Sequence, residues 1–150
     1  MKISSFMLSA LLPLCSANFD LYHEYFAMGD GEGIVWKAFQ NHPSRNEVLN
    51  AAVFPVDTDV SGRETGIRCV GWCNHGDRPG GIEVLEMHFR NNPLYHWTIY
   101  KNRNYEMIGL DGKVYGRCIP FPDAYYEEFI YYGRRKFRCL TRFTAADLNG

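Results

Sequence analysis

The sequence predicts a β-rich α+β domain, an antiparallel sheet or sandwich with one short helix at about residues 44–53 and two disulfide bonds. Three observations predict this fold. Short segments of alternating apolar and polar residues recur at about ten-residue spacing, with turn signals between them. Aromatic residues make up 15% of the 150-residue chain, including 10 tyrosines and 10 phenylalanines, and this composition favours strands. Four cysteines follow the first 17 residues, and an even number is typical of a disulfide framework.

Residues 1–17 have the three parts of a secretory signal peptide. Lys2 gives a positive start, residues 3–14 form an apolar run, and residues 15–17 (Cys-Ser-Ala) offer small side chains before a cleavage site. The apolar run is shorter than the roughly 20 residues that a membrane span needs. We therefore expect cleavage at this point and a single secreted, extracellular domain of residues 18–150 with no membrane span.

The strands and helices of this domain follow in order from alternation and turn signals. The clearest helix signal is the capping box Ser44-Arg45-Asn46-Glu47, after which Val48, Leu49, Ala52 and Val53 give one apolar face. Thr144 to Asp147 repeats the capping box and predicts a final helical turn. The predicted strands are residues 19–28, 33–39, 66–72, 82–90, 94–101, 105–110, 113–119 and 135–143.

The four cysteines of the mature chain are expected to form two disulfides, because the chain is predicted to be exported. If residues 66–73 are extended, Cys69 and Cys73 lie about 13 Å apart and cannot join each other. We therefore expect each of them to bridge to Cys118 or Cys139. A zinc site is disfavoured because paired C-x2-C spacing is absent, and the loop aspartates match no calcium motif. No metal and no cofactor are expected.

The segments 82–90 and 94–101 form a hairpin whose register can be predicted. A turn at residues 91–93 would pair 88 with 96 and 86 with 98, which sets apolar Met87 opposite Trp97. A slip of one residue would oppose an apolar face to a polar one. The polar face then carries Glu86, His88, Arg90, His96, Thr98 and Tyr100.

This polar set resembles that of the small secreted guanyl-preferring ribonucleases of fungi and bacteria, and Tyr22-His23-Glu24-Tyr25 is similar to their Tyr-x-His segment. The resemblance implies a hydrolase with Glu86, His88, Arg90, His96 and Tyr100 as candidate catalytic residues. One histidine or the glutamate would accept the 2′-hydroxyl proton, a second histidine would protonate the leaving oxygen, and the arginine would stabilise negative charge. The alternative, which we favour, is the solvated face of a half-buried sheet.

A basic cluster near the end of the chain is a candidate binding surface. It consists of Arg134, Arg135, Lys136, Arg138 and Arg142, with Phe137 and Phe143 interleaved. It could contact phosphates or an acidic partner, or it could be a solvated strand face. The whole chain has a formal net charge of −1, which gives no general attraction to nucleic acid or anionic membranes. We expect no nucleic-acid partner unless the protein is ribonuclease-like.

Two further resemblances complete the sequence interpretation. Residues 100–105 (YKNRNY) resemble the aromatic hairpin of βγ-crystallin-type domains, some of which are microbial toxins, although Met107 stands where that motif has glycine. The export signal, the sparse cysteines and the stretches 94–116 and 134–150 resemble small secreted, effector-like proteins of filamentous ascomycete fungi. This second resemblance implies an extracellular role at an interface with a host or competitor. We expect a non-enzymatic interaction protein, a monomer, whose partner is a protein or glycan of another organism.

Overall fold

The computed structural model describes residues 18–150, and the predicted signal peptide, residues 1–17, lies outside the described residues. The strands are β1 (Asn18–Met28), β2 (Gly31–Phe39), β3 (Phe54–Pro55), β4 (Gly66–Gly71), β5 (Ile82–His88), β6 (His96–Tyr100), β7 (Glu106–Gly109), β8 (Val114–Pro120), β9 (Tyr125–Glu128) and β10 (Tyr131–Thr141). The α-helices are α1 (Arg45–Asn50) and α2 (Ala145–Asn149). Antiparallel pairing of these strands and the presence of two disulfides confirm the predicted β-rich α+β fold.

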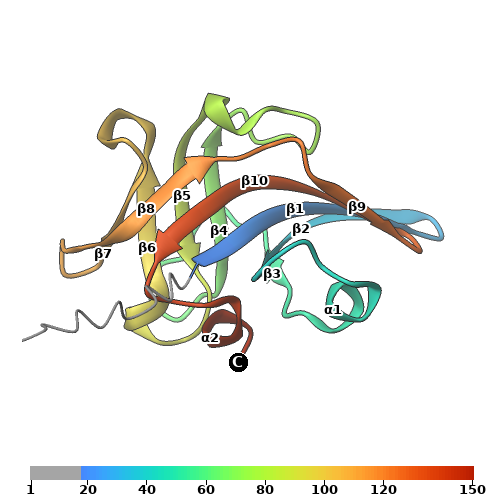
Figure 1. The fold of residues 1–150 in the computed structure, drawn as a ribbon, viewed down its shortest axis with the longest axis horizontal. Coiled ribbons are helices and arrows are strands. Elements are labelled where there is room, and N and C mark those ends of the chain that lie inside the picture. The colour runs from blue at the N-terminus through green and yellow to red at the C-terminus, as the bar shows by residue number, and fades with distance from the viewer. Residues whose placement is uncertain (1–17) are drawn as a thin grey trace, which may run out of the picture.

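The sheet follows the order β3-β2-β1-β10-β8-β7-β6-β5-β4, and β9 pairs with β10 outside this path. The two ends of the path meet where Val56 forms a parallel bridge with Ile67. The amide of Asp57 also donates to the carbonyl of Ile67 at 3.1 Å. The sheet is therefore nearly closed into a barrel, which fills the left half of Figure 1.

The barrel interior is the main core, and it confirms the predicted hairpin register. Leu85 lies opposite Ile99 and Met87 opposite Trp97, with all four side chains fully buried. Complete burial of such a side chain stabilises a fold by roughly 1.5–3 kcal/mol. α2 packs against this core through Leu148, and its capping box between Thr144 and Asp147 confirms the predicted final helical turn.

Beyond the barrel, the long strands β1, β2 and β10 continue together with β9 as a curved extension (Figure 1). We call this extension the arm (residues 22–28, 31–37, 125–128 and 131–135). Successive side chains of a strand point to opposite faces, so the arm has two different surfaces. α1 covers one of them, where Tyr22, Phe39, Val48 and Tyr126 form a second small core.

The first helix is shorter than predicted. Its capping box between Ser44 and Glu47 is present, but the helix ends at Asn50 rather than near residue 53. Ala51 is already extended, and the chain then places Phe54 beside Trp36 in the sheet. Of the predicted apolar face only Val48 is fully buried, and two members, Leu49 and Val53, are exposed.

The predicted disulfide connectivity is wrong. The bonds join Cys69 to Cys73 and Cys118 to Cys139. Residues 66–73 are not extended throughout, because β4 ends at Gly71, next to a register shift and with a φ of +105°. The chain turns there, which brings the Cα atoms of Cys69 and Cys73 to 6.1 Å. Cys118 and Cys139 face each other directly in the β8–β10 ladder.

Candidate functional site

The two histidines of the predicted catalytic set are neighbours, but they are buried rather than solvated. His88 and His96 are paired across β5 and β6, and their rings stack with centroids 4.3 Å apart. Each residue is only 2% exposed. The loop 57–65 folds over them, and Nδ1 of His88 donates to the carbonyls of Val60 (3.1 Å) and Glu64 (2.6 Å). The expectation of a solvated polar face is therefore wrong at this pair.

Glu86 is the centre of a small polar network on the same face. Its carboxylate accepts from Nε2 of His96 at 3.1 Å and from Nε of Arg68 at 2.9 Å. Burial alone would raise the pKa of Glu86, but the hydrogen bonds from Arg68 and His96 outweigh it and hold that pKa below its usual range. The network thus fixes β4, β5 and β6 against one another.

The other two candidate catalytic residues lie apart from this network. The guanidinium of Arg90 donates through Nη1 to the carbonyl of Asp147 at 3.1 Å and lies over the ring of Tyr95. Tyr100 pairs with Val84 at the far end of the hairpin. A phosphodiester could reach neither buried imidazole without displacing the loop, so this arrangement does not favour catalysis.

The predicted basic cluster is divided by a β-bulge. Leu21 pairs with Phe137 and Tyr22 with Arg135, so Lys136 is the extra residue between them. Arg135 and Arg138 bind the buried carboxylate of Asp20, at 3.3 and 2.7 Å. Both guanidiniums also lie over the ring of Phe121. Within residues 18–150, Arg134 and Arg142 are the members of the cluster left exposed.

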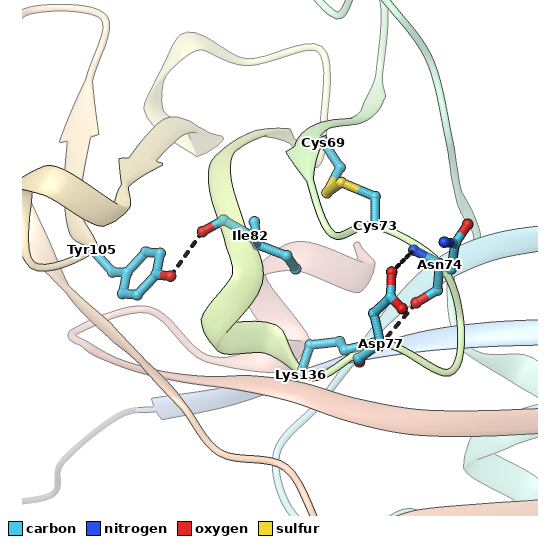
Figure 2. The surroundings of a disulfide bond; sticks show 7 residues. All are labelled: Cys69, Cys73, Asn74, Asp77, Ile82, Tyr105 and Lys136. Atoms are coloured by element: carbon cyan, nitrogen blue, oxygen red, sulfur yellow. Dashed lines mark hydrogen bonds between the residues drawn. A yellow bond between two sulfur atoms is a disulfide. The ribbon is translucent and has the colours of Figure 1, made fainter.

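Lys136 fixes the loop 72–81 against β10 (Figure 2). Its ammonium is buried and donates to the carbonyls of Asn74 (3.2 Å), His75 (3.0 Å) and Asp77. Burial lowers the pKa of Lys136 to about 8. We call this arrangement the lysine latch. The Cys69–Cys73 disulfide holds the start of the same loop, as Figure 2 shows.

A groove separates the latched loop from β9 and β10. One hollow, of about 400 Å³, is lined by Tyr25, His75, Tyr125, Tyr126, Glu127, Tyr132, Gly133 and Arg134. A second, of about 340 Å³, is lined by residues 76–79, 122–125 and 134–136. Tyr125 and Arg134 line both, so the two hollows adjoin at these residues. We call the combined feature the tyrosine groove, and its position makes it the candidate functional site.

The strand register explains how the groove is assembled. Tyr25 pairs with Tyr132, which pairs with Glu127, and these three side chains form a row across β1, β10 and β9. Arg134 pairs with Tyr125 in the next row. The sequence interpretation missed this site because β9 was not predicted and because Tyr25 and His75 come from segments far from β9 and β10 in the sequence. The cluster of tyrosines at residues 125–132 is the signal that could have indicated it.

The histidines beside the groove are held in the neutral form. His75 belongs to the latched loop, and its ring lies 5.6 Å from that of His23 and 6.1 Å from that of Tyr25. Burial, reinforced by the positive charges of Arg134 and Lys136, lowers the pKa of His75 to about 4. Burial, reinforced by Lys136 and by His75, lowers the pKa of His23 to about 3.

The depressed pKa of His23 predicts a loss of stability in acid. The unfolded chain takes up a proton at this residue below about pH 6.5, whereas the folded chain does not until about pH 3. Unfolding therefore binds a proton between these values, and the free energy of unfolding falls as the pH falls, by about 1.4 kcal/mol per pH unit. Urea titrations from pH 7 to pH 4 measure this slope. His23→Phe, which can still pack on Trp36, should reduce the slope by about this amount, and the slope that remains includes the contribution of His75, whose pKa is also lowered. Equal slopes in both proteins would contradict the assignment.

Comparison of the chain with protein-family models, curated proteins and solved structures gave no match. Among residues 18–150, no helix is both long and apolar enough to cross a membrane. The same residues contain no group of three or more His, Cys, Asp or Glu side chains placed to hold a metal ion.

Proposed function

We propose that the protein is a secreted, non-enzymatic binding protein that acts at an interface with a host or competitor organism and that recognises its partner through the tyrosine groove. The observation that carries the proposal is the exposed aromatic surface of the groove. Tyr125 is 73% exposed and Tyr132 is 37% exposed, on a rigid sheet. Tyrosine is enriched at recognition surfaces because it offers a large ring and a polar end with few rotatable bonds.

Two features support the extracellular part of the proposal. The sequence begins with the signal-peptide pattern of residues 1–17, and two disulfides are typical of proteins that fold in an oxidising compartment. The resemblance to effector-like fungal proteins agrees with such a role.

The ribonuclease alternative is less well supported by the geometry. General acid–base catalysis requires an acid and a base within hydrogen-bond reach of the substrate. His88 and His96 are both buried, His88 is bound to the loop 57–65, and Arg90 is bound to Asp147. The toxin alternative rested on residues 100–105, in which Tyr105 is buried and donates to the carbonyl of Ile82 at 2.7 Å.

Processing of the chain gives a direct test of secretion. If residues 1–17 are a signal peptide, protein recovered from a secreting host should begin at Asn18, with all four remaining cysteines oxidised. N-terminal sequencing and intact mass of the secreted product measure both. A product that retains Met1, or that remains inside the cell, would contradict secretion.

The binding role is tested with the intact oxidised protein on isolated cell walls from plants, fungi and bacteria. Saturable binding of the wild type to one of these, lost in the double variant Tyr125→Ala, Tyr132→Ala, is the expected result. Tyr100→Ala is the matched control, because Tyr100 is a partly exposed tyrosine of β6 outside the groove. Equal binding by all three proteins would overturn the role of the groove. Cleavage of total RNA by the wild type, lost in His88→Ala, would favour the hydrolase instead.

A further inference from the structure

We infer that the tyrosine groove binds an uncharged oligosaccharide. This inference rests on the proposed function and names the chemical class of the ligand. It follows from the lining of the groove, from the polar groups left available there, from the balance of charge and from the way the groove is held open.

The lining of the larger hollow combines aromatic rings with polar groups. It is lined by four tyrosines, a histidine, a glutamate, an arginine and a glycine, and by no aliphatic side chain among the described residues. Three of the tyrosines, Tyr25, Tyr125 and Tyr132, lie on this face of the sheet, whereas the ring of Tyr126 is buried in the second small core. A protein partner is usually anchored by a few residues in a fully desolvated pocket, whereas Tyr125 here is 73% exposed. A sugar ring presents C–H groups on its faces and hydroxyls on its rim. It can therefore pack on tyrosine rings and still find hydrogen-bond partners beside them.

Four polar groups of the groove have no partner within residues 18–150. No hydrogen bond or ion pair engages the hydroxyls of Tyr125 and Tyr132, the guanidinium of Arg134 or the carboxylate of Glu127. The hydroxyl of Tyr25, by contrast, donates to Glu32 at 2.8 Å. Nδ1 of His75 is also without a partner and is buried. The available set includes donors and acceptors, as recognition of several hydroxyls requires.

The charges that line the groove offset one another. Arg78 pairs with Asp123 at 3.5 Å, and the Lys136 ammonium is occupied by the carbonyls of the latch. Arg135 is bound to Asp20, which leaves Arg134 with Glu127 in the same lining. A polyanion would need several unpaired cations, as a phosphate or sulfate surface does. The balance therefore favours a ligand without charge.

The groove is open before any ligand arrives. One wall is the β9–β10 ladder, and the other is the loop fixed by the lysine latch and the Cys69–Cys73 disulfide (Figure 2). A rigid site binds without the cost of ordering a loop. Hollows of about 400 and 340 Å³ lie in the range of ligand sites, about 300–1,000 Å³. The two hollows adjoin at Tyr125 and Arg134, and two neighbouring hollows suit a chain of sugar units better than a single small molecule.

The test is calorimetric titration of the oxidised protein with defined hexamers. The uncharged probes are cellohexaose, laminarihexaose and chitohexaose, and the charged probes are hexagalacturonate and chitosan hexamer. We expect saturable binding of at least one uncharged probe. Truncation of a ring that contacts the ligand should weaken this binding by about fivefold or more in Tyr125→Ala and in Tyr132→Ala. Tyr125→Phe, which keeps the ring, should lose less affinity than Tyr125→Ala, and Tyr100→Ala should bind as the wild type does. Circular dichroism confirms that each variant is folded.

Three outcomes would overturn the inference. They are binding confined to the charged hexamers, binding that the groove variants do not change, and the absence of binding to every probe. Enzymatic treatment of the cell walls distinguishes a failure of the oligosaccharide inference from a failure of the proposed binding function. Loss of binding after digestion of the wall with cellulase, β-1,3-glucanase or chitinase supports a glycan ligand. Loss after protease but after none of these glycanases overturns the glycan and leaves the groove as a protein-binding surface. Binding that survives in the groove double variant overturns the proposed function itself.

Discussion

Lys37→Met is expected to reduce the free energy of unfolding by about 3–5 kcal/mol, because it leaves a buried charge without its partner. Nζ of Lys37 lies 3.1 Å from Oε2 of Glu24, and the two side chains are only 4% and 1% exposed. The same ammonium donates to the carbonyl of Val48 at 2.7 Å, which ties α1 to the arm. Glu24 would keep only the hydroxyl of Tyr126, at 2.6 Å. Urea denaturation at pH 7 measures the loss.

A double variant separates the unpaired charge from lost packing. Glu24→Gln with Lys37→Met removes both charges, keeps an acceptor for Tyr126, and should recover most of the lost stability. The exposed pair of Lys101 and Glu83, at 3.5 Å, provides the matched control. Lys101→Met should cost less than about 1 kcal/mol. A double variant as unstable as the single one would show that packing, and not charge, sets the effect.

The two disulfides are expected to have different effects on stability and on binding. Cys118 and Cys139 are 21 residues apart in sequence and fully buried, whereas Cys69 and Cys73 are 4 residues apart. On the loop-entropy model, replacing Cys118 and Cys139 by alanine reduces the free energy of unfolding by about 3 kcal/mol. Replacing Cys69 and Cys73 by alanine reduces it by about 2 kcal/mol. Denaturant titration without reductant measures these losses, and peptide mapping verifies the bonds.

The variant without the Cys69–Cys73 disulfide should lose less stability than the variant without the Cys118–Cys139 disulfide. It should nevertheless lose more of the binding at the tyrosine groove. Cys69→Ala with Cys73→Ala frees the start of the latched loop, which is one wall of the tyrosine groove. Cys118→Ala with Cys139→Ala removes a bond within the barrel wall and leaves that loop attached. Equal weakening of groove binding by both variants, measured where each is still folded, would show that the disulfide does not position the loop.

Local patterns allowed much of the fold to be predicted from the sequence. The period-two alternation of 82–90 and 94–101 admits one register that opposes apolar to apolar, and His88 does lie opposite His96. Both predicted capping boxes are present at the N-termini of the two α-helices. They could be predicted because a capping box depends only on two residues three positions apart in the sequence. Such features depend on neighbours in sequence.

What could not be predicted depends on segments that fold back over the sheet. Val60 brings the loop 57–65 onto the two histidines, and no local pattern indicates which face that loop will cover. The turn at Gly71 that closes the Cys69–Cys73 disulfide requires a positive φ, which the alternation of 66–72 does not reveal. The bulge at Lys136 moves this side chain from a solvated face into the latch. The tyrosine groove adds β1 to the β9–β10 hairpin, and only the sheet topology makes β1 a neighbour of that hairpin.

The pairing of β1 with β10 has a consequence for how the chain reaches its native state. These are the first and last strands of residues 18–150, and their ladder joins Asn18 to Leu140. β1 can pair early with β2, and β5, β6, β7 and β8 can pair as successive hairpins, but the other edge of β1 waits for β10, which follows all the other strands of residues 18–150. Closing so long a loop is slow, because its entropy must be lost before any contact compensates. Phe19 and Leu21 stay accessible to chaperones and to other unfinished chains until β10 arrives, so the time before that event is when the protein is most prone to aggregate.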